Sequence, residues 1–187
     1  MTEVMDCLPE YCRRSTLILG CGNILLGDDG FGPEVIAYLK TNYPIPEDVM
    51  LMDAGTGVGE ILLDVALSDK RPERVILIDA MENGQPAGTI STLHLEDIGR
   101  RQTRTLSAHQ VPTSTLLKEL KELGKVEVTV LTVEPGQIPQ DIQPGLSPIV
   151  REAVPRACEF IVKRFLCSHE NSMAQELLDQ AIANARR

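Results

Sequence analysis

The segment TLILGCGNILLGDDGFGPEVIAYLKT, residues 16–41, decides how this chain begins to fold. It opens with a short apolar run, residues 16–20, that ends in glycine and is typical of a buried strand. A glycine-rich loop follows, and from residue 31 to 41 apolar side chains recur at the spacing of a helix face. A strand, a tight loop and a helix in this order indicate the first unit of an α/β fold.

The rest of the chain repeats this alternation of strands and helices. The clearest further strand is 74–80, which stays apolar until Asp79. Prolines and glycines between 135 and 145 mark a long loop. Continuously apolar strands that alternate with helices predict a mostly parallel sheet covered on both faces. The other strands that we expect are 49–53, 89–95 and 126–133, and the helices are 59–67, 112–123 and 148–165, with a last helix or loose tail over 172–185.

Composition and charge exclude several classes of function. The chain has 27 acidic and 18 basic residues in 187, a net charge of −9, which disfavours a nucleic-acid partner. No stretch approaches the ~18 apolar residues of a membrane span, and the first fourteen residues hold no secretory signal. The five cysteines form no C-x-x-C pair. We therefore expect a cytoplasmic protein with incidental thiols and no membrane insertion.

The length predicts one domain with an extension at each end. We expect the domain over 15–167, after an N-terminal extension, 1–14, that is frayed. A helical or flexible C-terminal tail is expected over 168–187.

Acidic residues follow the first three predicted strands. Asp28 and Asp29 come after the first strand, Asp53 after the second, and Asp79 ends the third. Open α/β sheets bind their ligands beyond the carboxyl ends of the strands, where the strand order reverses. We therefore expect these acids to converge on one edge of the sheet.

The glycine loop allows more than one interpretation. Gly20 and Gly22 fit the first two positions of the dinucleotide fingerprint G-x-G-x-x-G, but Leu25 occupies the third. Asp28 and Asp29 would repel a pyrophosphate at the helix start, although acids there can also act as helix caps. A Rossmann-like cofactor-binding protein, a pair of capping acids, and acids held for metal or proton chemistry all stay open.

At this loop the chain resembles a known family. The pattern G-x-G-N-x-L-x-x-D-[DE]-x-x-G over residues 20–32 is similar to the signature of the hydrogenase maturation endopeptidases, which process the large subunit of nickel–iron hydrogenases. The resemblance covers about residues 15–165 and is greatest to the branch that serves deazaflavin-reducing hydrogenases of methanogens. Further matches follow in order: LMDAGTG (51–57), VILIDAM (75–81), LSAHQVPT (106–113), LTVEPG (131–136) and GLSPIV (145–150).

The resemblance implies a fold and a site. The fold is a three-layer α/β/α sandwich around a mostly parallel, five-stranded twisted sheet with one antiparallel strand. Asp29, Asp79 and His109 match the positions that bind the nickel of the substrate and serve catalysis. Relatives often have Glu at the first position, and the shorter Asp29 leaves open whether Asp28 makes the closer contact. The nickel comes with the precursor, so no tightly bound metal of the chain's own is expected.

The implied reaction is removal of the C-terminal extension of the precursor once nickel has been inserted. We expect water as the nucleophile, activated by the metal or a carboxylate, with the metal or a glycine-loop N–H stabilising the oxyanion. The D-[ST]-G signature of pepsin-like proteases is absent because Ala54 follows Asp53. Cys21 with His109 is a further candidate nucleophile, although nothing in the sequence indicates a lowered thiol pKa.

Some polar residues have simpler expected roles. Asp53 is expected to support the turn at Gly55 and Thr56, while His94 and His169 are expected to be structural or solvated. A nickel assembly scaffold that binds the precursor without cutting it is a further alternative. Such a scaffold would leave the mass of the precursor unchanged, whereas an endopeptidase would shorten it.

Overall fold

The computed structural model describes residues 8–93, 110–122 and 124–166. Each predicted strand is present, and the helix expected over 148–165 is formed by three short helical segments in succession. None of the helices within these described ranges has the length and hydropathy to span a bilayer. The strands are β1 (Thr16–Cys21), β2 (Val49–Gly55), β3 (Arg74–Ala80), β4 (Ile90–Leu93) and β5 (Glu127–Val133). The helices are α1 (Phe31–Asn42), α2 (Val58–Leu67), α3 (Gln110–Glu122), α4 (Pro148–Arg151) and α5 (Ala153–Ile161), with shorter helical turns η2 (Glu10–Cys12), η3 (Gly27–Gly30) and η4 (Val162–Leu166).

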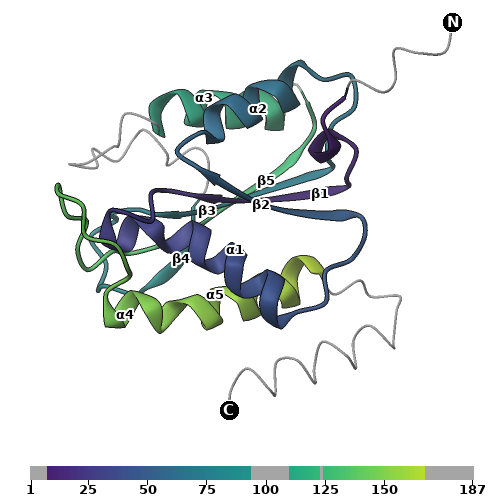
Figure 1. Cartoon of the computed structure of the whole chain (residues 1–187). Coiled ribbons are helices and arrows are strands. Elements are labelled where there is room, and N and C mark those ends of the chain that lie inside the picture. Colours follow the sequence, from purple (N-terminus) through teal and green to yellow (C-terminus); the bar gives the residue numbers. More distant parts are fainter. Residues whose placement is uncertain (1–7, 94–109, 123, 167–187) are drawn as a thin grey trace, which may run out of the picture.

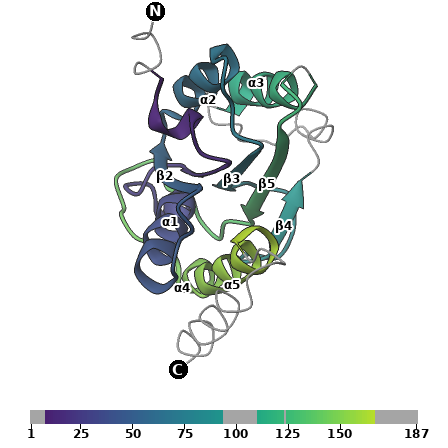
Figure 2. The ribbon, with the colours of Figure 1, turned by 90° about the vertical axis from the view of Figure 1, so that its right-hand side faces the viewer.

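The five strands form one sheet in the order β2-β1-β3-β5-β4. The pairs β1–β2, β1–β3 and β3–β5 are parallel, and the edge strand β4 runs antiparallel to β5. Helices α2 and α3 cover one face of the sheet, and α1, α4 and α5 cover the other (Figure 2). This arrangement confirms the expected three-layer α/β/α fold with one antiparallel strand.

The central strand β1 is buried along its whole length because both faces of the sheet are covered. Ile18 packs in a core with Phe31 and other residues of the α1 and α5 layer. Its neighbours Leu17 and Leu19 pack in a second core with α2 and α3. Side chains of a strand alternate between the faces, so a strand that is apolar at every position contributes to two cores at once.

The N-terminal extension is packed from residue 8 onward, which corrects the expectation that it is frayed. Cys12 is buried in the core on the α2 side. The Tyr11 hydroxyl donates a hydrogen bond to Asp64 of α2 over 2.6 Å. Burial and this carboxylate raise the pKa of Tyr11 above its usual value, so the phenol remains protonated as a donor. The turn η2 therefore closes one end of the α2-side core. The expected tail over 168–187 lies outside the described residues.

Two glycines allow the start of α1 to lie directly against β1. A Cβ placed on Gly32 would lie 2.4 Å from the carbonyl oxygens of both Cys21 and Ile78. A Cβ on Gly20 would meet the Gly32 carbonyl oxygen at 2.5 Å. These positions have no room for a side chain because backbone contacts backbone. The glycines of the loop therefore serve close helix–strand packing, which is also one of the uses of glycine in dinucleotide folds.

The carboxylate of Asp28 joins the glycine loop to the long loop between β5 and α4. Asp28 is fully buried. Its side chain accepts hydrogen bonds from the N–H groups of Gly136 (2.8 Å), Gln137 (2.9 Å) and Ser147 (2.7 Å), and from the Ser147 hydroxyl (2.9 Å). Four donors match the acceptor positions of an ionised carboxylate. The helix α1 has Gly30, without a side chain, at its N-cap position, so the interpretation of Asp28 as a cap of α1 is wrong.

Backbone hydrogen bonds extend this junction along both loops. Gly27 N–H donates to the Gln143 carbonyl (2.9 Å), and Gln143 N–H donates to the Leu25 carbonyl (2.8 Å). Asp28 N–H donates to the Gln137 carbonyl (3.2 Å). Both loops lie at the end of the sheet where α1 begins, on the left in Figure 1. The edge of the sheet that carries the acids is therefore bordered by two loops that fix each other.

We expect Gly32→Ala to destabilise the fold. The new methyl group would overlap backbone atoms of β1 and β3 that cannot move apart without breaking the sheet, so we expect a loss of roughly 3 kcal/mol or more. Urea unfolding measures the change. Gly59→Ala is the matched control because a Cβ there meets nothing within 4 Å, and alanine in a helix gains about 0.5–1 kcal/mol over glycine. Equal effects of the two substitutions would contradict the proposed packing.

We expect Asp28→Asn to destabilise the fold as well. The amide offers one acceptor oxygen and turns an NH2 group toward N–H donors, so at least one buried N–H loses its acceptor at a cost of roughly 1–3 kcal/mol. Asp53→Asn, at an exposed position, is the control and should change the free energy of unfolding by less than about 0.5 kcal/mol. If urea unfolding gave the same stability for both variants, the role of Asp28 as a buried junction would be wrong.

Candidate functional site

The carboxyl ends of β1, β2 and β3 meet at one edge of the sheet, as the sequence predicted. In the sheet register, Gly20 of β1 stands beside Asp53 of β2 on one side and Ile78 of β3 on the other. Asp79 follows at the next position of β3. The acids after the second and third strands are therefore brought to the end of β1, next to the loop that carries Asp29.

Cys21, the last residue of β1, lies among these acids. Burial raises the pKa of its thiol well above the usual value, the carboxylate of Asp79 raises it further, and Asp53 and Asp29 add to the effect. A hydrogen bond with the Ile78 backbone acts in the opposite direction. Asp29, Asp53 and Asp79 all act on this one thiol, and we refer to them together as the acidic cluster. A buried thiol with a raised pKa is also a poor nucleophile.

The structure separates the roles of the two neighbouring acids in the glycine loop. The carboxylate of Asp28 is enclosed and bound by four donors. Asp29 is only half-buried, and its Oδ2 accepts a hydrogen bond from the Asn23 N–H over 2.7 Å. Asp29 is therefore the more accessible carboxylate of this loop.

The other two acids of the cluster differ in exposure. Asp79 is half-buried, and its Oδ1 accepts a hydrogen bond from the Ala80 N–H over 2.9 Å. Asp53 is exposed, and its Oδ1 accepts the Gly55 N–H over 3.0 Å. The expected support of the turn at Gly55 is confirmed. Asp29 and Asp79 are thus both partly accessible at the carboxyl ends of the strands.

The three histidines lie outside the described residues. His109 directly precedes α3, whose first residue is Gln110. Over residues 8–93, 110–122 and 124–166, no group of three or more His, Cys, Asp and Glu side chains is arranged to hold a metal ion. The structure thus brings Asp29 and Asp79 together and leaves the expected position of His109 as a prediction.

Two residues that anchor the site were not assigned a role from the sequence. Glu134 is buried, and its carboxylate accepts the N–H groups of Asn83 (2.7 Å) and Gly84 (3.1 Å) in the loop after β3. Ser147 donates both its N–H and its hydroxyl to Asp28. Both residues belong to quoted motifs, LTVEPG and GLSPIV, and an acid directly after a buried strand is the signal that could have pointed to Glu134.

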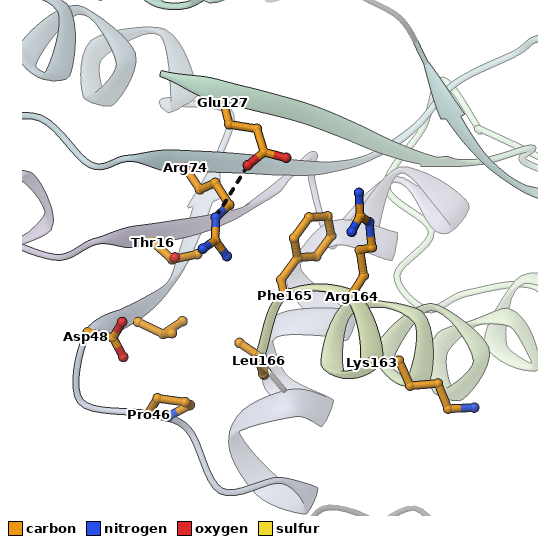
Figure 3. Close-up of a pocket in the computed structure, with 10 residues that line it drawn as sticks. Thr16, Pro46, Asp48, Arg74, Glu127, Lys163, Arg164, Phe165 and Leu166 are labelled. Atoms are coloured by element: carbon orange, nitrogen blue, oxygen red, sulfur yellow. Dashed lines mark ion pairs between the residues drawn. The ribbon is translucent and has the colours of Figure 1, made fainter. Parts of the chain in front are cut away.

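A cavity of about 470 Å³ lies at the opposite edge of the sheet (Figure 3). It opens at the amino ends of β1, β2, β3 and β5, and Arg74 and Glu127, on the adjacent strands β3 and β5, form an ion pair of 3.5 Å at its wall. Open α/β sheets bind ligands at the carboxyl ends of their strands. None of the acids described above lines the cavity, so we place the candidate site at the acidic cluster.

Known proteins resemble this chain over most of its length. The sequence profile of a family described as hydrogenase maturation protease matches residues 33–164. A putative hydrogenase maturation protease of Methanocaldococcus jannaschii is 35% identical over 151 residues, which are 80% of this chain and 96% of that protein. The coenzyme F420 hydrogenase subunit delta of Methanothermobacter thermautotrophicus is 35% identical over 150 residues, which are 78% of this chain and 91% of that protein.

A solved structure shows the same fold. The hydrogenase maturating endopeptidase HybD from E. coli superposes with a TM-score of 0.66 at 30% sequence identity, and the match covers 79% of this chain and 90% of that one. The family profile spans more than half of the chain, and the two archaeal relatives match over more than nine tenths of their own length. The chain therefore belongs to the hydrogenase maturation protease family.

Proposed function

We propose that this protein is an endopeptidase that removes the C-terminal extension of the large-subunit precursor of a nickel–iron hydrogenase after nickel has been inserted. The observation that supports this most is the pair of half-buried carboxylates, Asp29 and Asp79, around one strand end. Such a pair suits the recognition of a cation and the activation of water. The similarity to the delta subunit of a coenzyme F420 hydrogenase favours a deazaflavin-reducing hydrogenase as the substrate.

The nickel belongs to the substrate in this proposal. Asp29, Asp79 and His109 would contact the nickel that the precursor already holds, and so test whether insertion is complete. Two carboxylates and one imidazole form a ligand set of borderline hardness that suits a divalent first-row metal and leaves other coordination positions to the precursor. The protein itself then needs no tightly bound metal.

Water is the proposed nucleophile. One of the two carboxylates takes a proton from the water, whose oxygen attacks the scissile carbonyl carbon, and the proton passes to the departing amine. The thiol of Cys21 does not compete for this role, because burial raises its pKa well above the usual value and the neighbouring acids disfavour a thiolate. The reaction is thus a hydrolysis that uses carboxylates of this protein and the nickel ion bound to the precursor.

The glycine loop contributes less to oxyanion stabilisation than the sequence indicated. The N–H groups of residues 22, 23 and 25 to 29 already donate to acceptors within the protein. Ile24 has the remaining N–H of this loop. We therefore assign most of the stabilisation of the oxyanion to the nickel of the precursor, which is the nearest positive charge in the proposed complex.

Two alternatives make different predictions for one experiment. A non-cleaving nickel scaffold would bind the precursor and leave its mass unchanged, and a Rossmann-like protein would bind a nucleotide cofactor. The carboxylate of Asp29 before α1 does not favour the cofactor, because it would repel a pyrophosphate there. We expect the mass of a co-expressed large subunit to fall by the mass of its extension only when this protein and nickel are both present.

We expect Asp29→Asn, Asp79→Asn and His109→Ala each to slow the cleavage of nickel-loaded precursor by roughly a hundredfold or more, because each removes a group that contacts the metal or the water. Cleavage is followed by mass spectrometry, and circular dichroism verifies the fold. Asp69→Asn, at an exposed position away from the cluster, is the control and should cleave at the wild-type rate. Wild-type rates in all three site variants would exclude the proposed mechanism.

We expect Cys21→Ala to cleave nickel-loaded precursor at a rate within about threefold of the wild type, because the thiol is buried and its raised pKa keeps it protonated. In the native protein, Cys21 should also resist a thiol reagent at mildly alkaline pH. Peptide mapping after labelling measures the second effect, with urea-unfolded protein as the positive control. A cleavage rate as low as that of Asp79→Asn in a folded Cys21→Ala protein would identify the thiol as the nucleophile instead.

A further inference from the structure

We propose that four exposed aliphatic side chains next to the acidic cluster form a docking surface for the folded body of the precursor. They are Ile24, Leu25, Ile138 and Ile142, called the apolar rim here. This inference rests on the proposed function and adds to it the place where the substrate is held. The contact would lie beside the reacting peptide bond and would be separate from the nickel contact.

The exposure of these side chains is high for their size. Ile24 is 54% exposed, Leu25 44%, Ile138 37% and Ile142 75%. Single exposed aliphatic residues are ordinary on protein surfaces, but several together at one place are typical of interaction sites. Four of the eight large hydrophobic residues that are exposed in the described part of the chain belong to these two loops.

The rim is one surface because its two loops are hydrogen-bonded to each other. Gln143, which follows Ile142, donates its N–H to the carbonyl oxygen of Leu25 over 2.8 Å. A Cβ placed on Gly27 would lie 2.8 Å from Pro139 Cδ, so the segment around Ile138 lies against the glycine loop as well. The buried carboxylate of Asp28, in the glycine loop, also accepts hydrogen bonds from the long loop and so connects the two. The rim is therefore preformed, and binding does not have to order it.

The chemistry of the rim fits an apolar protein surface. Residues 22–27 and 135–145 contain one charged side chain, the exposed Asp141 beside Ile142, although the chain as a whole is 24% charged and has a net charge of −9. A strongly acidic protein with so few charges on one surface favours a partner that is apolar there. The rim is also continuous with the site, since the residue before Ile24, Asn23, donates its N–H to the carboxylate of Asp29. A precursor whose nickel lies at Asp29 must therefore cover the rim.

The test compares two matched double variants in the cleavage of nickel-loaded precursor. The first is Leu25→Asn with Ile142→Asn. The control is Leu63→Asn with Leu67→Asn, which changes two leucines of α2 with similar exposure, 46% and 75%. We expect the rim variant to raise KM roughly tenfold or more, because each side chain would no longer bury its apolar surface. Its kcat should stay within about twofold, and the control should keep both constants.

Salt gives a second readout. Ions do not screen apolar contacts, so the KM of the wild type should change little with ionic strength. If the precursor were recognised by surface charges, its binding would weaken and KM would rise as the ionic strength increases. A rim variant with wild-type KM, or a control variant with an equal rise in KM, would overturn the docking surface while leaving the protease function intact. Wild-type protein that does not cleave the precursor at all would overturn the proposed function and the docking surface with it.

Self-association is the competing explanation for an apolar rim. Sedimentation of the wild type and the rim variant distinguishes the two explanations. A monomeric wild type supports the precursor as the occupant. A wild-type dimer that dissociates in the rim variant would assign the surface to a second copy of the chain and overturn the proposal.

Discussion

The hydrogen bonds to the buried carboxylate of Asp28 are the interactions on which this structure depends most. A buried charge is strongly unfavourable unless hydrogen bonds replace its lost water, and here three backbone N–H groups and one hydroxyl do so. The donors come from Gly136, Gln137 and Ser147, more than one hundred residues further along the chain. The requirement to satisfy one buried charge therefore fixes the glycine loop, the long loop after β5 and the start of α4 relative to one another.

The contrast between Asp28 and Asp29 follows from the local backbone. Both residues lie in the short 3-10 helix η3, in which successive side chains point about 120° apart. One carboxylate is thereby directed into the protein and the other toward the edge of the sheet. Two identical neighbouring residues thus have different roles: Asp28 connects the two loops, and Asp29 is accessible at the edge of the sheet.

The sequence predicted the elements well and the contacts between distant loops poorly. Continuously apolar runs such as 74–80 identified the buried strands, since burial on both faces leaves no polar positions. The family resemblance added the strand number and the antiparallel edge. The roles of Asp28, Glu134 and Cys12 were missed because their partners lie far away in the sequence, where no local pattern records them. For the site, the convergence of Asp29 and Asp79 was predictable from strand ends, while the position of His109 remains a prediction.

The long sequence separation between Asp28 and Ser147 also bears on how the protein folds. The parallel core of β1, β2 and β3 is complete by residue 80, but the donors that fix the glycine loop arrive only with residues 136–147. Contacts between such distant residues form late because the intervening chain must first be ordered. A ribosome-bound chain that has reached residue 80 can therefore have the parallel core of its sheet while the loop that carries Asp28 and Asp29 still lacks the partners that fix it.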